Sequence, residues 1–72
     1  MVEMQIVQSS NIEAIGYDET AQELHIRFLK SGKTYVYPGV PVDVYQGLMA
    51  APSHGSYFSQ FIKPFYTNFY VL

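Results

Sequence analysis

The sequence contains no cysteine and no long apolar run, and each absence narrows what the protein can be. Without cysteine there are no disulfides and no thiolate metal sites, and a reducing cytoplasm suits such a chain. No stretch approaches the roughly eighteen apolar residues that a membrane-spanning helix needs, so we expect no membrane partner. The first residues also lack the basic and then apolar layout of a secretion signal. We therefore expect a cytoplasmic protein.

Charged side chains are scarce, and positive ones are the scarcest. Four basic residues stand against six acidic ones, which gives a formal net charge of −2. Proteins that bind nucleic acid usually present a basic stripe, because neutralising phosphates supplies most of their affinity. Nucleic acid is therefore the less favoured partner. The scattered basic residues are Arg27, Lys30, Lys33 and Lys63.

The residue types and spacings of catalytic and metal sites are also missing. The two histidines, His25 and His54, have no further ligand at the spacing of a metal site. The serines lie outside nucleophile motifs, and the isolated glycines form no phosphate-binding loop. The sequence argues against an enzyme, and we expect no catalytic residues, no cofactor and no bound metal.

What the sequence does have is apolar bulk. The 72 residues are 49% hydrophobic and 17% aromatic, which suffices for one small core and leaves no room for a second. Ser9, Ser10 and Asn11 form a turn signal that separates an N-terminal arm from the body. We divide the chain into the arm (1–10), the body (11–63) and an aromatic C-terminal tail (64–72).

The first half of the body has the pattern of a β-sheet. Apolar and polar residues alternate over 23–28, which predicts a strand with one buried face. A strand over 12–17 precedes it, with Gly16 marking a bulge or a close backbone approach. After the tight turn at Gly32, a third strand covers 33–37. Because the connections are short, we expect an antiparallel three-stranded meander, with the arm or the tail as a candidate fourth strand.

The second half of the body has the pattern of helices. Pro41 suits the first helical turn and Asp43 lies near the positive end of the helix dipole, so we expect a helix over 41–50. A second, short helix over 56–62 ends before Pro64. The predicted fold is α+β, with one main helix packed on the sheet, then the short helix and the tail.

An ordered series of short motifs resembles a known family, the KTSC domain, which is named for its occurrence at the C-terminus of some lysyl-tRNA synthetases. The resemblance runs from about Ser9 to Ile62 and implies a small α+β domain without catalysis, here as a free-standing member. RNA binding has been suggested for the family. The matching residues are Ser9-Ser10-Asn11-Ile12, Ile15-Gly16-Tyr17-Asp18, Tyr35-Val36-Tyr37, Val40-Pro41, Val44-Tyr45, Leu48-Met49 and Gly55-Ser56-Tyr57-Phe58.

The chain departs from the family pattern after the second helix. Domains that it resembles tend to carry several basic residues there, whereas this segment holds only Lys63. RNA binding therefore stays the alternative function, and its candidate residues are Arg27, Lys33, Tyr35 and Tyr37. The two tyrosines share a strand face, where they either stack on bases or pack beneath the 41–50 helix.

Aromatic residues are concentrated at the C-terminus. Of the seven tyrosines and five phenylalanines, seven lie between Tyr57 and Tyr70. The tail rings either fold back on the core, as an edge strand or cap, or form an apolar patch for a partner. The candidate protein-binding residues are Phe65, Tyr66, Phe69 and Tyr70.

These features favour a small non-enzymatic module that binds a protein partner. Through the family resemblance, we expect that partner in the transcription or translation machinery, and a virus-encoded regulator of a host apparatus would suit such a domain. We expect a monomer or a weak homodimer sealed by the tail rings.

Overall fold

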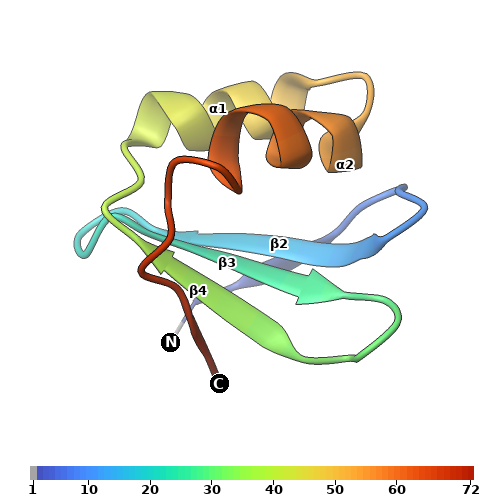
Figure 1. Ribbon diagram of the computed structural model, residues 1–72, viewed down its shortest axis with the longest axis horizontal. Coiled ribbons are helices and arrows are strands. Elements are labelled where there is room, and N and C mark those ends of the chain that lie inside the picture. The colour runs from blue at the N-terminus through green and yellow to red at the C-terminus, as the bar shows by residue number, and fades with distance from the viewer. Residues whose placement is uncertain (1) are drawn as a thin grey trace.

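The computed structural model describes residues 2–72 and shows two layers, a twisted β-sheet with helices on one face (Figure 1). The α+β fold is as the sequence predicts. All the strands are antiparallel and lie in the sheet in chain order. They are β1 (Met4–Ile6), β2 (Ile12–Asp18), β3 (Glu23–Phe28), β4 (Thr34–Pro38) and β5 (Tyr70–Val71).

Within residues 2–72 the sheet has five strands, more than the three or four that the sequence predicts. The arm supplies β1 and the tail supplies β5, so both termini join the sheet at its edges. Each covers an edge of the meander whose amides and carbonyls would otherwise have no partner strand. Gly16 makes a close approach to the arm: a Cβ there would lie 2.6 Å from the Met4 sulfur. The register irregularity falls between Ile12 and Ala14 instead.

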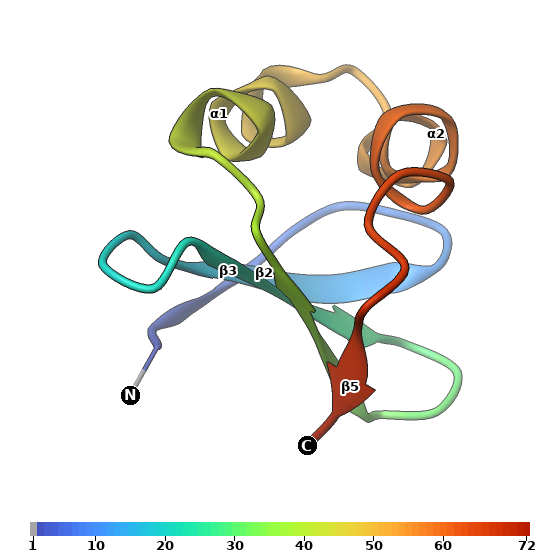
Figure 2. The same cartoon turned by 60° about the vertical axis from the view of Figure 1, so that its left-hand side comes forward.

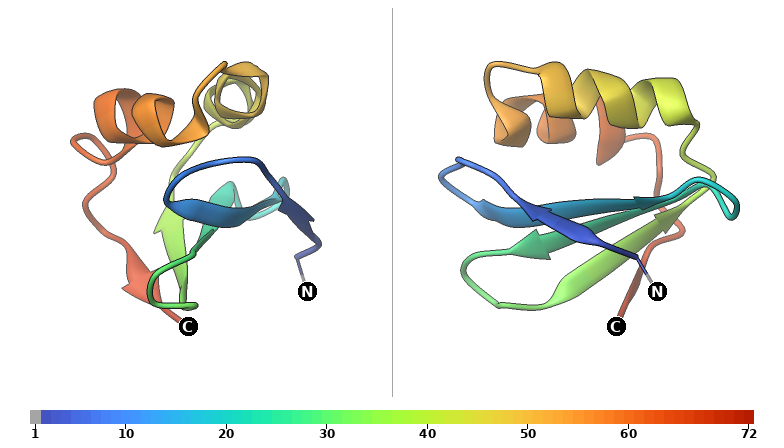
Figure 3. Two further views of the ribbon diagram at one scale, coloured as in Figure 1. Left: turned by 90° about the vertical axis from the view of Figure 1, so that its right-hand side faces the viewer. Right: turned by 180° about the vertical axis from the view of Figure 1, so that it is seen from behind.

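Two helical segments cover the sheet. Helix α1 (Val42–Ala50) begins directly after Pro41, close to the predicted start. Helix α2 (His54–Tyr57) follows the loop, with the Ser53 hydroxyl accepting a hydrogen bond from the Ser56 amide at 3.2 Å. It continues into η1 (Phe58–Ile62), a single π-helical turn. Figure 3 shows both helical segments in one layer above the sheet, with the two termini on the other side.

The core lies between the helices and the facing side chains of the sheet. Each large aliphatic side chain that is fully removed from water there contributes about 1.5–3 kcal/mol relative to an exposed one. The cluster includes rings as well as aliphatic side chains. Its buried members are Ile12, Ile15, Leu24, Ile26, Tyr37, Val40, Leu48, Phe58 and Ile62.

The aromatic tail crosses from the helical layer to the sheet. It leaves the end of η1 and descends to β5, which lies beside β4 (Figure 2). The pairing is short, because Val71 lies opposite Tyr35 and Tyr70 opposite Val36. The Leu72 amide adds a hydrogen bond to the Thr34 carbonyl at 2.9 Å. A short edge strand therefore holds the tail in place.

Candidate functional site

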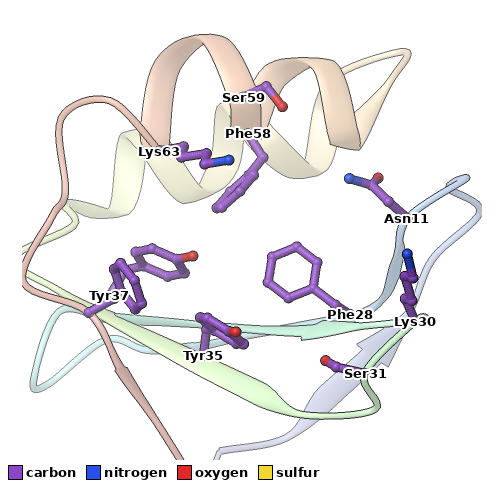
Figure 4. A pocket seen from close by; sticks show the side chains of 10 residues that line it. Asn11, Phe28, Lys30, Ser31, Tyr35, Tyr37, Phe58, Ser59 and Lys63 are labelled. Atoms are coloured by element: carbon purple, nitrogen blue, oxygen red, sulfur yellow. The ribbon is translucent and has the colours of Figure 1, made fainter.

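A cleft of about 400 Å³ lies between β4, η1 and the tail, and we call it the aromatic cleft (Figure 4). Its walls come from both layers of the fold. Five of its ten lining residues are aromatic, and the rest are polar or basic. They are Asn11, Phe28, Lys30, Ser31, Tyr35, Tyr37, Phe58, Ser59, Lys63 and Phe69.

The five rings contact one another through edges and tilted faces. Tyr35 meets Phe28 edge-on at a centroid distance of 5.2 Å, and Phe69 lies tilted over it at 5.5 Å. Tyr37 meets Phe58 at 5.4 Å and Phe69 at 5.4 Å. Such arrangements suit the ring quadrupoles and contribute about 0.5–1.5 kcal/mol per pair beyond area burial. Phe69 therefore bridges both strand tyrosines.

The strand pattern explains why the two tyrosines enter the cleft. Ile26 pairs with Tyr35 and Leu24 pairs with Tyr37, so both tyrosines share the helix-facing side of the sheet. The predicted shared face is therefore present. The rings that contact Tyr35 and Tyr37 come from β3, η1 and the tail.

Exposure rises from the inner end of the cleft to its rim. Tyr37 and Phe58 are each only 4% exposed, while Phe69 is 46% exposed. Burial, with a smaller effect from neighbouring Tyr35, raises the pKa of Tyr37 to about 12. The cleft therefore combines a floor that belongs to the core with a wall that solvent reaches.

The π-helical turn helps to bring Lys63 to the cleft. The Lys63 amide donates to the Phe58 carbonyl five residues earlier at 2.9 Å, where an α-helix would pair residues four apart. The wider turn allows Phe58 and Lys63, five residues apart, to line the same cleft. π-Helical turns occur frequently at functional sites.

The second lysine of the cleft comes from the β3–β4 turn. Figure 4 shows Lys30 on the hairpin side and Lys63 on the helical side. None of the ten lining residues is acidic. In the part of the chain that the structure describes, residues 2–72, the one ion pair joins Arg27 to Glu13 at 3.4 Å, so both cleft lysines are free of carboxylate partners.

The structure separates the candidate RNA-binding residues. Tyr35 and Tyr37 line the cleft, but Arg27 lies in β3 between the core-facing positions and points to the other side of the sheet. Lys33 is exposed in the β3–β4 turn and is not among the lining residues. The four residues therefore do not form one surface.

The four candidate protein-binding residues of the tail are also separated. Phe69 lines the cleft, whereas Tyr66 packs against the core and Phe65 is 70% exposed outside the cleft. Tyr70 lies on the opposite sheet face, where its hydroxyl donates to a Glu23 carboxylate oxygen at 3.5 Å. Of these four residues, only Phe69 lies in the cleft with Tyr35 and Tyr37.

Sequence reasoning missed four of the residues that complete the cleft. Phe28 belongs to the alternating pattern over 23–28, Phe58 is one of the residues that match the family, and Lys30 is one of the scattered basic residues, so no pattern marks these three as a site. The one available signal was Lys63, the single charge in an otherwise uncharged aromatic segment. Its position depends on the π turn, which no local pattern in the sequence predicts.

The family model of the KTSC domain matches residues 8–66 of the chain. The chain belongs to the KTSC domain family. The resemblance inferred from the sequence is thus confirmed. The matched region contains the floor of the aromatic cleft, and it ends before Phe69.

Relatives of this KTSC domain occur both as small proteins and within larger ones. A protein of Tsukamurella paurometabola is 48% identical over 61 residues, which cover 85% of this chain and 90% of that protein. A lysine–tRNA ligase of a Nostoc species is 45% identical over 56 residues, which cover 78% of this chain and 10% of the ligase. The chain thus matches a small part of that enzyme.

A solved structure has the same fold. The crystal structure of a KTSC domain protein from Yersinia pestis superposes with a TM-score of 0.85 at 39% identity. The match covers 100% of this chain and 96% of that chain.

Residues 2–72 contain no group of three or more His, Asp or Glu side chains placed to hold a metal ion. Over the same residues, no helix combines the length and the apolar character that crossing a membrane requires.

Proposed function

We propose that this KTSC domain is a small non-enzymatic module that binds a protein partner through the aromatic cleft. The observation that carries the proposal is the half-exposed ring of Phe69 standing over Tyr35 and Tyr37 beside an open cleft of about 400 Å³. Aromatic anchors in a pocket with a polar rim are typical of the energetic centre of protein interfaces.

The ring geometry favours a protein over nucleic acid. A base needs an open aromatic face on which to stack. Phe69 covers Tyr35, and Tyr37 is 4% exposed, so neither tyrosine offers such a face. Arg27 lies on the other sheet face and pairs with Glu13. These observations support a protein partner.

A partner in the translation or transcription machinery is part of the proposal. It is supported by the similarity of this chain to a segment of lysine–tRNA ligases, which are translation enzymes. The lack of cysteine supports action in the reducing cytoplasm. We propose that the domain acts there as a monomer or a weak homodimer, with its cleft available to the partner.

The test compares two matched substitutions in affinity purification from lysate. Phe69→Ser removes the ring that lies over Tyr35 and Tyr37. Phe61→Ser is the control, because Phe61 is 52% exposed and is not a lining residue of the cleft. Thermal unfolding verifies that both variants are folded.

We expect specific proteins to be captured by the unaltered chain and by Phe61→Ser, and lost with Phe69→Ser. Capture that is equal for all three chains would count against the cleft as the binding site. Treating the lysate with ribonuclease tests the RNA-binding alternative. Capture that is lost after this treatment depends on RNA and would indicate nucleic-acid binding instead.

A further inference from the structure

We infer that the aromatic cleft binds a peptide segment in which an acidic residue lies next to an aromatic side chain. This inference rests on the proposed function and adds the chemical class of the partner's binding segment. The rings of the cleft contact the aromatic side chain of that segment, and the lysines of the cleft contact its acidic residue.

The charge of the lining selects an acidic ligand. The six acidic residues of the chain lie outside the cleft, and they are Glu3, Glu13, Asp18, Glu19, Glu23 and Asp43. Lys30 and Lys63 approach from opposite sides and have no carboxylate partner within residues 2–72 (Figure 4). The cleft is therefore locally positive in a protein whose net charge is −2. Such complementarity sets specificity more than affinity.

The rings supply most of the binding energy. Phe69, which is 46% exposed, gives a partner side chain an apolar surface to pack on, beside the buried floor that Tyr37 and Phe58 form. The cleft volume of about 400 Å³ lies at the small end for ligand pockets, so the cleft suits one or two side chains of an extended segment. Asn11, Ser31 and Ser59 offer neutral polar groups at the rim.

The probe is a short fluorescein-labelled peptide with one phenylalanine flanked by two glutamates in a glycine–serine background. Two control peptides replace the phenylalanine by alanine or the glutamates by lysine. Fluorescence anisotropy measures binding to the unaltered protein, to Lys63→Glu and to Lys33→Glu. Lys33 is the matched control, since it is exposed in the β3–β4 turn and does not line the cleft.

We expect the acidic phenylalanine peptide to bind and both control peptides to bind more weakly. Lys63→Glu reverses a charge at the cleft and should weaken binding by about fivefold, as expected for a rim ion pair. Lys33→Glu should change it by less than about twofold, because its charge is screened by solvent. Equal binding of the glutamate and lysine peptides, or no binding of either, would overturn the inference.

A competition experiment separates this inference from the proposed function. The acidic peptide, added to the lysate at roughly millimolar concentration, should displace the proteins whose capture depends on Phe69. If those proteins stay bound, the peptide class is wrong while the proposed function stands. If no capture depends on Phe69, the proposed function itself fails. Tighter binding of a single-stranded RNA of similar length, with a steep loss on adding salt, would assign the lysines to phosphates instead.

Discussion

Two aromatic clusters lie between the helices and the sheet, and they differ in which segments of the chain hold their rings. Beneath α1, Tyr17 and Tyr45 stack at 4.7 Å with an angle of 9° between the rings. The Tyr17 hydroxyl also donates to the Val40 carbonyl at 2.6 Å. Beneath η1, Tyr35 and Tyr37 contact Phe69 through tilted rings beside an open cleft.

The difference shows that aromatic content alone does not distinguish a core from a binding surface. In the stacked pair, the Tyr17 hydroxyl is hydrogen-bonded to the backbone. Tyr17 belongs to β2 and Tyr45 to α1, so both rings are carried by main elements of the fold. In the aromatic cleft, the outer wall is a tail held by a two-residue strand. A wall supported by so few backbone hydrogen bonds opens at low free-energy cost.

The largest expected effect tests whether the stacked Tyr17–Tyr45 pair contributes more stability than the cleft wall. Tyr17→Ala removes a partly buried ring, its stacking contact and its hydrogen bond, and should lower the free energy of unfolding by about 2 kcal/mol. Phe69→Ala removes a ring that is 46% exposed, and should lower it by about 1 kcal/mol. Urea unfolding of both variants measures the difference. An equal loss for the two variants would mean that Phe69 is ordinary core.

A smaller effect, confined to alkaline pH, concerns the buried floor of the cleft. Burial raises the pKa of Tyr37 to about 12 in the folded protein, above the value near 10 of an unfolded chain. Between these values the unfolded chain releases the proton first, so stability is level below about pH 10 and falls as pH rises toward 12. Unfolding measured over a pH series reports this loss.

Tyr37→Phe is the matched control for the alkaline loss, because it keeps the ring and removes the titrating hydroxyl. Part of the loss should remain in this variant, since burial also raises the pKa of Tyr17, helped by the nearby carboxylates of Glu19, Asp43 and Asp18. An unchanged pH profile in Tyr37→Phe would show that Tyr37 titrates normally and that the cleft floor is more open than its 4% exposure indicates.

Local signals in the sequence predicted the elements that depend on near neighbours. Pro41 and Asp43 gave the start of α1, and the alternation over 23–28 gave β3 and its buried face. The same period placed Tyr35 and Tyr37 on one face. These features depend on the periodicity of apolar residues and on residue preferences at helix ends, which act over a few residues.

The edge strands and the cleft depend on contacts between distant segments. A two-residue strand such as β5 has no periodicity of its own, so its pairing with β4 cannot be read from the tail. The cleft joins residues from the arm–body turn, two strands, η1 and the tail. Lys63 reaches it in part through a π turn. Tertiary packing, rather than local preference, makes the site.

The most direct test of the central claim is a photocrosslink from the cleft wall. A benzophenone amino acid is placed at Phe69, which is 46% exposed, and in a second chain at Val42, which is 37% exposed at the start of α1. After irradiation in lysate, we expect discrete protein adducts from position 69 and none of them from position 42. The same adducts from both positions, or nucleic-acid adducts from position 69, would contradict a protein-binding cleft.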